Sequence, residues 1–589
     1  MINFQEIHLQ LPRIKEEKKH ALLHQFTKTT ILLFKNFKKK KKNEPLSVAA
    51  CEKAKRRLRE LTGYGIEDIG GLVIDEVSFV NAEFLGIIDQ RFRDLLGQRD
   101  VVFGGLPLFL VGDNFQKQPP ASFPWFKSLV QHSAGSLKKT NYHIDLGIQV
   151  VKQARLHTLT RNMRAANDPD FADDLAKLRD ITKEKPVTLE FLDSIEVLTP
   201  EDCRGEFRFG PVGVLSHQER DEINFLCVER FAREHKIPLF KWRQTPYGID
   251  GKKKFSDKQL GDLDLVASQE KMLWGYFVVG APGLFTTNVA CTMKLVNGTQ
   301  GLLHSMILQN NDDDTLYKDA MATPGFQVVV LSEPPAVINI AVGNSGDTAV
   351  KWHGIELPDL SDVLPAAAAF QSSNGVQIVP LPYSTASCRK QPITEIVRCR
   401  GHFAAMTGMQ HVEVHTHGFQ LAFALTDFKL QGRTLKKLII SNIHRPMKPH
   451  MDLASLYVLV SRATSRSGLR WLRSDRSLLD SMADRLKHTK ELKIWCQGYG
   501  DDGEWDTDKA KQLWLDYKKA KSRVKKPSKR KVSAVAAKTR QVTLQTTAKK
   551  VRTCQSKTWT NGSHCREKGV GEKEEEMIEK LLTQIPPAY

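Results

Sequence analysis

The chain has 589 residues and a mass of 66.6 kDa, with 41% hydrophobic and 26% charged residues. This length and composition exclude a peptide, a single small module and a disulfide-stapled mini-protein, and they are typical of a globular chain with several cores. The formal net charge of +20 indicates an acidic partner such as nucleic acid or an anionic membrane surface, or an import receptor.

The excess positive charge lies in two runs outside the expected cores. Residues 35–42 contain 6 Lys and residues 518–552 contain 14 Lys and Arg, and neither run contains an acidic residue. Residues 1–46 are therefore predicted to form a basic N-terminal extension. The segment from about Asp516 is predicted to be a basic tail, most of it disordered until it meets a partner. It suits nuclear import or salt-sensitive phosphate binding, and the alternative is a solvated charge run with neither role.

The positions of the cysteine, histidine and apolar residues bear on three possibilities: a secreted disulfide protein, a membrane span and a metal site. The nine cysteines include no Cys-x-x-Cys pair, which disfavours a secreted disulfide framework and indicates a reducing compartment. No apolar run reaches the roughly 18 residues of a membrane span, so no membrane-spanning segment is expected. Of the partners that the charge allows, a membrane is not the expected one. His411, His415 and His417 would share one face of a strand, which allows a metal site but favours a polar sheet face.

Residues 47–200 show short apolar runs alternating with amphipathic segments, which predicts an α/β fold with helices covering a parallel sheet. The first clear strand is GGLVIDEVSFV, closed by Asp75 and Glu76. Asn81 is expected to cap a helix. That helix is predicted to bury Phe84, Ile87, Ile88, Phe92 and Leu95. A second buried strand, LPLFLVGD, follows.

Further along, Asp168 and Pro169 predict the start of another helix. The residues expected in its buried face are Phe171, Leu175 and Leu178. A second α/β layer is predicted over residues 201–485, with strands PVGVLS and LKKLIIS and a helix around LASLYVLVSRAT. Within it, residues from about 303 to 418 are predicted to be a small all-β insertion. Residues 486–589 form the C-terminal segment.

Polar residues that close apolar strands are the candidate catalytic groups, because ligands bind beyond the carboxyl ends of strands in an open α/β sheet. Asp75 could hold magnesium through its water shell, and Glu76 could orient or deprotonate an attacking water. Gln116, after a Gly-Asp turn, could bond a terminal phosphate or that water. The alternatives are an acidic surface turn and a polar loop.

Two arginines and one loop complete the set of candidates. Arg164 and Arg462 could each neutralise charge on a transferred phosphoryl group, although either alone is more often part of a surface ion pair. The run AFALTDFKLQGRTLKKLII supplies a polar loop suited to contact with a phosphate backbone, without base reading. Its candidate contacts are Thr426, Lys429, Gln431, Gly432 and Thr434.

Six blocks in order carry a resemblance to a known family. They are LVIDEVSFV, FGGLPLFLVGDNFQKQPP, LTRNMRAANDPDFADDLAKLR, MKLVNGTQG, AFALTDFKLQGRTL and LYVLVSRATSRSGL. Together they resemble the Pif-type DNA helicases of superfamily 1B, from about Leu72 to Leu472. The resemblance implies two RecA-like P-loop NTPase domains, with a small β-barrel inserted in the second, and ATP-driven 5′-to-3′ movement along single-stranded DNA.

The resemblance also implies roles and partners. By position, Asp75 matches the magnesium-associated acid, Glu76 the catalytic base, Gln116 the γ-phosphate sensor, and Arg164 and Arg462 the transition-state arginines. The residues expected to touch DNA are Thr426, Lys429, Gln431, Gly432, Thr434, Asn297 and Thr299. The implied cofactors are ATP and Mg²⁺, and the implied partner is single-stranded, forked or structured DNA.

The resemblance further suggests a monomer acting in DNA replication, repair, recombination or telomere maintenance. The nucleus is the expected location, with the mitochondrion as the alternative.

One family motif is absent from the sequence. The chain contains no GxxxxGK[ST], the loop whose backbone amides cradle phosphates. The first RecA-like domain, over residues 47–200, is therefore expected to be incomplete, and the chain as written is expected neither to bind ATP tightly nor to unwind DNA. An incomplete copy of an active helicase is the favoured interpretation. The alternatives are a non-catalytic single-stranded-DNA-binding remnant and a helicase fragment of a mobile element.

Overall fold

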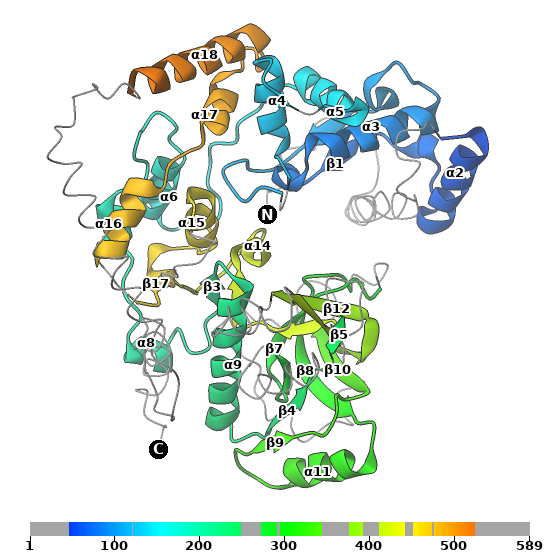
Figure 1. The fold of residues 1–589 in the computed structure, drawn as a ribbon, viewed down its shortest axis with the longest axis vertical. Coiled ribbons are helices and arrows are strands. Elements are labelled where there is room, and N and C mark those ends of the chain that lie inside the picture. The colour runs from blue at the N-terminus through cyan, green and yellow to red at the C-terminus, as the bar shows by residue number, and fades with distance from the viewer. Residues whose placement is uncertain are drawn as a thin grey trace, which may run out of the picture.

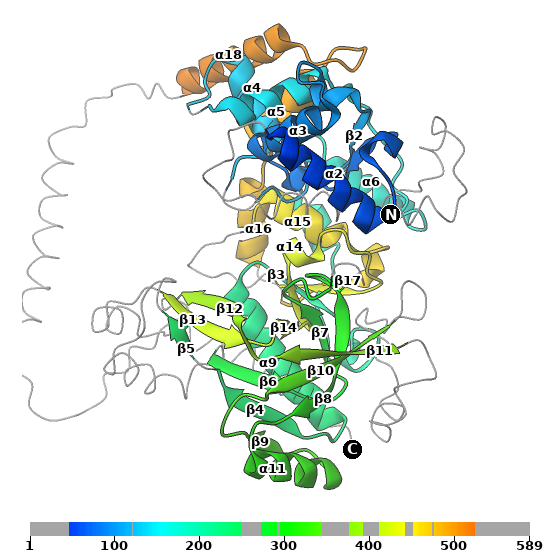
Figure 2. The same ribbon diagram turned by 90° about the vertical axis from the view of Figure 1, so that its right-hand side faces the viewer.

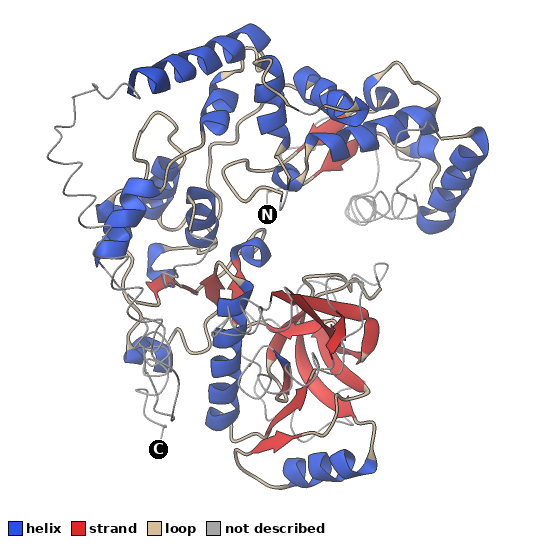
Figure 3. Cartoon of the chain, viewed as in Figure 1, coloured by secondary structure: helices blue, strands red, loops and turns tan. Residues whose placement is uncertain are grey.

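The computed structural model describes residues 46–524 except 120–121, 139, 245, 249–272, 291–294, 344–375, 393–410, 442–450 and 474–475. Three parts follow one another along the long axis in Figures 1 and 2. A largely helical first α/β domain is followed by a second parallel sheet with its helices, and then by a β-rich unit. Most strands gather in that last part, as Figure 3 shows. The predicted basic extension up to residue 45 and the tail beyond residue 524 lie outside the described residues.

The first α/β domain is built on a two-stranded parallel sheet. Strand β1 (Leu72–Ile74) pairs with β2 (Leu108–Leu110). The helices are α2 (Val48–Thr62), α3 (Ala82–Leu96), α4 (Trp125–Ser133) and α5 (Tyr142–Gln153), and 3₁₀ turns span Ile66–Asp68, Val77–Phe79 and Val102–Gly105. Asn81 caps α3 as predicted, since its side chain accepts a hydrogen bond from the Phe84 amide at 2.7 Å.

Two predicted burials in this domain are wrong. Phe84 is 41% exposed, because the buried stripe of α3 passes through Leu85, Ile88 and Phe92 instead. Strand β2 is not fully buried, and its central residue Phe109 is 48% exposed. Alternate residues of a strand face opposite sides of the sheet, and the described elements cover the Phe109 side only in part.

Helices α3 and α5 cross at close range through two glycines. A Cβ atom at Gly86 would lie 1.8 Å from the carbonyl oxygen of His143, and one at Gly147 would lie 1.9 Å from the carbonyl oxygen of Ala82. Both distances are far below van der Waals contact, so the crossing requires glycine on both helices. Beside it, the buried ring of His143 lies 2.6 Å from the Oε1 atom of Gln90.

The second α/β domain has a four-stranded parallel sheet in the order β15-β3-β16-β17. Its strands are β3 (Val212–Val214), β15 (Ala424–Thr426), β16 (Leu438–Ile440) and β17 (Leu469–Trp471). Its helices are α6 (Pro169–Leu178), α7 (Leu189–Asp193), α8 (Pro200–Arg204), α9 (His217–Glu234), α14 (Asp427–Leu430), α15 (Leu453–Val460) and α16 (Arg476–Arg485). The predicted strands PVGVLS and LKKLIIS and the helix LASLYVLVSRAT are confirmed.

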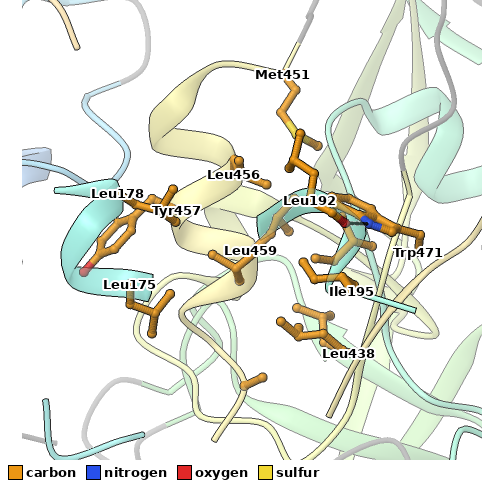
Figure 4. Packing of buried hydrophobic residues seen from close by; sticks show 14 of the residues in the cluster. Leu175, Leu178, Leu192, Ile195, Leu438, Met451, Leu456, Tyr457, Leu459 and Trp471 are labelled. Atoms are coloured by element: carbon orange, nitrogen blue, oxygen red, sulfur yellow. Dashed lines mark hydrogen bonds between the residues drawn. The ribbon is translucent and has the colours of Figure 1, made fainter. Parts of the chain in front are cut away.

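The core of this domain gathers segments from distant parts of the chain. Trp471 is 1% exposed and donates its indole N–H to the carbonyl oxygen of Leu192 at 2.9 Å. Figure 4 shows Leu438 and Leu459 beside the same cluster. A fully buried tryptophan with a bonded N–H satisfies both its apolar surface and its polar atom, and this stabilises the packing of α7 on the sheet.

Core membership differs from the domain division expected at residue 200. Asp168 caps α6, and the helix buries Phe171, Leu175 and Leu178 as predicted, but all three lie in the core of the second domain. Residues from the C-terminal segment return to the first domain instead. Helices α17 (Lys490–Gln497) and α18 (Thr507–Val524) place Trp495 and Trp514 in its core.

The basic tail predicted from about Asp516 begins as a helix, because α18 continues to Val524. The buried face of α18 explains this extension. Ala510 and Trp514 are packed in the first core, and Lys490 lies 3.7 Å from the Trp514 ring centroid. Tertiary packing therefore stabilises a helix that the basic composition of the segment does not favour.

The β-rich unit contains three sheets with strand orders β11-β10-β8-β7-β14, β12-β13-β5 and β6-β4-β9. Its strands are β4 (Leu239–Arg243), β5 (Pro246–Gly248), β6 (Trp274–Phe277), β7 (Pro282–Phe285), β8 (Gln300–Ile307), β9 (Val328–Val330), β10 (Val337–Gly343), β11 (Val376–Pro382), β12 (Ser384–Pro392), β13 (His411–Thr416) and β14 (Phe419–Leu421). The unit therefore begins upstream of residue 303. It also contains helix α11 (Asn311–Ala322), so it is not all-β as predicted.

The two parallel sheets with their helices confirm the predicted α/β class, and the β-rich unit lies within the second domain as expected. In the part of the chain that the structure describes, no helix is both long and apolar enough to cross a membrane. Among those same residues, no group of three or more His, Cys, Asp or Glu side chains could hold a metal ion.

His417 predicts a loss of stability in acid. It is 6% exposed, its Nε2 atom lies 2.9 Å from the carbonyl oxygen of Pro335, and burial lowers its pKa to about 4. In the unfolded chain the His417 imidazole is protonated near pH 6.5, whereas in the folded chain it is protonated only near pH 4. The contribution of neutral His417 to the free energy of unfolding is therefore complete above about pH 6.5 and is lost as the pH falls toward 4. We expect urea unfolding of the His417→Asn variant to depend less on pH over this window, by up to about 3 kcal/mol. Equal pH slopes for variant and parent would contradict this.

Candidate functional site

The acidic pair at the end of β1 is the first part of the site. Asp75 is exposed, and its Oδ1 atom accepts a hydrogen bond from the Glu76 amide at 2.7 Å. Glu76 has a left-handed backbone conformation, with φ of 52°. Such strain in a non-glycine residue costs about 1 to 3 kcal/mol and clusters at functional sites. The turn directs the Glu76 side chain toward the second domain, where its partner Gln431 lies.

The loop after β2, residues 111–117, carries Gln116 and is here called the β2 loop. The Asp113 carboxylate accepts hydrogen bonds from the Phe115 amide at 3.0 Å and from Gln116 Nε2 at 3.2 Å. A carboxylate can only accept, so it selects the amide nitrogen of Gln116 and leaves the Oε1 atom facing away. That Oε1 atom is buried and has no hydrogen-bond partner among the described residues. A buried acceptor without a partner indicates a ligand or water position.

Arg179, which directly follows α6, holds the other side of Asp113 and was not predicted from the sequence. Its Nη1 atom lies 2.5 Å from Asp113 Oδ2 and 3.0 Å from the Tyr457 hydroxyl on α15. Burial alone would lower the pKa of Arg179, but Asp113 and Tyr457 hold it above its ordinary value. The guanidinium also lies 4.5 Å from the Phe115 ring centroid. Nothing in the sequence near Arg179 signals this role, since its partners are far away in the chain.

Residues 427–434, here called the α14 segment, approach the acidic pair from the second domain. Gln431 donates its Nε2 hydrogens to Glu76 Oε2 at 2.8 Å and to Ser78 Oγ at 3.2 Å, and its Oε1 accepts from the Lys117 amide at 3.2 Å. Gly432 has φ of +79°, and a Cβ atom there would lie 3.6 Å from Glu76 Oε1. The segment thus contacts both strand ends of the first domain.

A buried ion pair fixes the same contact. Lys117 Nζ lies 3.2 Å from Asp427 Oδ2 and 2.8 Å from Ser455 Oγ, and the side chains of Lys117 and Asp427 are 13% and 4% exposed. The ammonium also lies 5.0 Å from the centroid of the Phe428 ring. The β2 loop is therefore joined to the second domain by charged groups at Asp113 and at Lys117.

The two predicted arginines lie close to this junction. Arg164 donates to Thr434 Oγ1 at 3.0 Å and to the Ser461 carbonyl oxygen at 2.9 Å. Arg462 is 1% exposed and donates to the Val458 carbonyl oxygen at 3.0 Å and to Ser461 Oγ at 2.8 Å. Burial lowers the pKa of Arg164, and burial together with the Arg164 charge lowers the pKa of Arg462 to about 10.

The residues predicted to contact DNA lie in different places: some at the turn before β8, some beside the catalytic candidates, and Thr426 buried at the end of a strand. Lys429 donates to Asn297 Oδ1 at the turn before β8, and Thr299 in the same turn bonds the Val296 amide at 3.0 Å. Gln431 and Thr434 contact Glu76 and Arg164 in the structure, on the side of the catalytic candidates. The remaining candidate at this loop, Thr426, is 5% exposed at the end of β15.

The residues of this junction fit a terminal phosphate. Arg164 and Arg462 form no ion pair with a carboxylate in the described part of the chain, although their charges lie close enough to lower one pKa. Two desolvated cations side by side are stabilised by an anion between them. Gln116 Oε1 supplies an acceptor for water nearby, and the exposed carboxylate of Asp75 fits a hydrated magnesium ion.

No protein-family model matches the chain. The ATP-dependent DNA helicase PIF1 of Emericella nidulans is 25% identical over 417 residues, which cover 69% of this chain and 47% of the relative. The chain thus spans about half the length of this curated relative.

Solved structures matched by the chain include the Pif1 helicase of Candida albicans, at 19% identity and a TM-score of 0.36, with 76% of this chain and 78% of that chain covered. Bacteroides Pif1 bound to single-stranded DNA is 17% identical with a TM-score of 0.43, and 79% and 80% are covered. The resemblance seen in the six ordered sequence blocks is confirmed by the Emericella relative, and the chain is similar to a Pif1-type DNA helicase over 69% of its length.

Proposed function

We propose that the chain is of the Pif type of ATP-dependent 5′-to-3′ DNA helicase and that its partner is single-stranded or forked DNA. The observation that carries the proposal is the contact of Gln431 with Glu76 at 2.8 Å, which joins the candidate DNA loop to the candidate catalytic base. The similarity to the Emericella helicase supports the same function. We extend the proposal to a monomer that acts in DNA replication, repair, recombination or telomere maintenance in the nucleus, with the mitochondrion as the alternative.

In this function each polar group of the junction has a distinct role. When bound, ATP with Mg²⁺ supplies the phosphoryl group and neutralises part of its charge. Asp75 would hold the ion through water, and Glu76 would accept a proton from the attacking water. The Oε1 atom of Gln116 would accept a hydrogen bond from that water, while Arg164 and Arg462 stabilise the charge that develops on the phosphoryl oxygens.

The α14 segment couples the candidate site of ATP hydrolysis to the candidate site of DNA binding. Its Gln431 contacts Glu76 and the Lys117 amide, and its Lys429 contacts Asn297 in the turn between β7 and β8 of the β-rich unit. Figure 1 shows α14 between the first domain and the β-rich unit. A movement of the Glu76 side chain would therefore shift Gln431 and, through the same eight-residue segment, Lys429. Hydroxyl, amide and lysine groups there suit contacts with a phosphate backbone.

We further propose that the chain as written binds single-stranded DNA without hydrolysing ATP. The motif GxxxxGK[ST], which supplies most ground-state contacts to nucleotide phosphates, does not occur in the sequence. The groups that remain at the junction act on the transition state and cannot replace the lost binding of the ground state.

Binding of an oligo-dT strand and DNA-stimulated ATPase activity test both statements. We expect the full chain to bind oligo-dT with an affinity that falls steeply as salt rises, and to show no DNA-stimulated hydrolysis. The Glu76→Gln variant, which keeps the shape of the side chain, should bind DNA equally well. ATPase activity that disappears in this variant would refute the loss of hydrolysis and leave the helicase function standing. Failure of the parent chain to bind oligo-dT would refute the proposed function itself.

A further inference from the structure

Arg433 occupies a special position in the α14 segment. Its Nε atom donates to the Lys429 carbonyl oxygen at 2.8 Å, and its Nη2 atom donates to the Gly298 carbonyl oxygen at 3.0 Å. It therefore spans the same two loops that Lys429 and Asn297 join. Figure 2 shows α14 beside the upper edge of the β-rich unit, as Figure 1 does.

Among the described residues, the charges around Arg433 are unbalanced. Neither Arg433 nor Lys429 forms an ion pair with any carboxylate of the described residues. Burial lowers the pKa of Arg433, and burial followed by the charges of Arg433 and Arg220 lowers the pKa of Lys429. Arg220 has its own partner, Asp221, at 2.8 Å. Two like charges are thus held together in a partly desolvated place, which costs free energy unless an anion is bound.

The geometry leaves donors available for that anion. A guanidinium has five N–H hydrogens in a planar fork, and the two hydrogen bonds of Arg433 use only two of them. Its side chain is half-buried and the flanking Gly432 and Thr434 are exposed, so solvent reaches this place. A Cβ atom at Gly298 would meet nothing within 4 Å, which leaves open space beside the turn. A phosphate group suits a fork of this kind through two parallel hydrogen bonds.

We propose that Arg433, together with Lys429, binds a backbone phosphate of single-stranded DNA where the second α/β domain meets the β-rich unit. The inference rests on the proposed function and adds a contact that the sequence did not indicate. The carbonyl groups of Lys429 and Gly298 orient the guanidinium, and its remaining N–H groups bind the phosphate. Base identity has no part in such a contact.

The test is a salt titration of oligo-dT binding by fluorescence anisotropy with the full chain. Arg433→Gln should weaken binding about five- to tenfold near 100 mM salt and reduce the slope of log K against log salt by about 0.7, the value for one phosphate of a single strand. Arg433→Lys, which keeps the charge, should retain the parental slope. The matched control is Lys437→Gln on the same domain, where the lysine pairs with Glu206, and it should stay within about twofold.

Two outcomes separate this inference from the proposed function. If the parent binds oligo-dT and Arg433→Gln leaves the slope unchanged, the phosphate contact is refuted while the DNA-binding function stands, since a purely structural role would not alter counterion release. If the parent does not bind oligo-dT, thermal unfolding with inorganic tripolyphosphate decides. A rise in Tm that Arg433→Gln abolishes would support the anion subsite and refute the function. No rise, or one that survives in the variant, would refute the subsite.

Discussion

Replacement of Lys117 by methionine is expected to lower the free energy of unfolding by about 3 kcal/mol, because it leaves the Asp427 carboxylate buried without its cation. The Asp427 side chain is 4% exposed, and Lys117 Nζ lies 3.2 Å from it. Methionine keeps an unbranched apolar stem of similar length, so the charge is lost together with the contact of the ammonium with the Phe428 ring. Urea unfolding followed by tryptophan fluorescence measures the change.

A double-mutant cycle identifies the cause of this loss. The variant Lys117→Met with Asp427→Asn should recover most of the stability, with a coupling energy of about 1 to 3 kcal/mol, because asparagine can still accept from the Phe428 amide at 2.9 Å. Lys177→Met is the matched control. Its lysine is 59% exposed in an ion pair with Asp174, so the change should be under about 1 kcal/mol. A loss that persists fully in the double variant would show that the ion pair is not responsible.

The same substitution should also loosen the junction between the two α/β domains. Lys117 reaches Asp427 and Ser455 with its side chain and Gln431 with its backbone amide. Loss of the side-chain contacts should raise hydrogen exchange in the α14 segment more than in β16, which lies inside the second sheet. Equal hydrogen exchange of the α14 segment in the parent and in Lys117→Met would show that the other contacts of the junction are enough to hold the segment in place.

Gly147→Ala is expected to have a comparable effect on the first domain, lowering the free energy of unfolding by about 3 kcal/mol. The new Cβ atom would lie 1.9 Å from the carbonyl oxygen of Ala82 and must push α5 away from α3. Backbone atoms cannot move aside as a flexible side chain can, so the whole helix crossing must widen. Alanine is otherwise the better helix former, by about 1 kcal/mol, so propensity alone predicts the opposite sign.

Urea unfolding and near-ultraviolet circular dichroism would measure the effect of Gly147→Ala. The control is Gln149→Ala, two residues further along α5 at an exposed position, which should change the stability by less than about 0.5 kcal/mol. A Gly147→Ala variant as stable as the parent would mean that the two helices do not approach as closely as described.

The sequence predicted the local features of the fold well. Asn81 and Asp168 are helix caps, because a cap involves only the residue itself and the amide three positions later. The strands that end at Ile74 and Val214 were found from short apolar runs. The polar residues after β1 and β2 were identified because they directly follow those strands. Each of these features depends on a few neighbouring residues.

The contacts of the site could not be predicted in the same way. Arg179 reaches Asp113 across 66 positions and Tyr457 across 278, and Gln431 reaches Glu76 across 355. No periodicity links such residues, since their distance depends on how the sheets and helices are connected. The sequence also assigned Gln431 and Thr434 only to DNA, whereas the structure brings them to Glu76 and Arg164.

By itself, the sequence determined the α/β class, the order of the six blocks and the types of polar group available, because residue chemistry and local spacing are readable along the chain. Only the tertiary structure decided that α6 belongs to the second core and α17 and α18 to the first, and that Lys117 meets Asp427. The physical reason is that burial of apolar surface is non-directional. It rewards any pairing of apolar faces, so the pairing is selected only when the complete set of helices and sheets packs together.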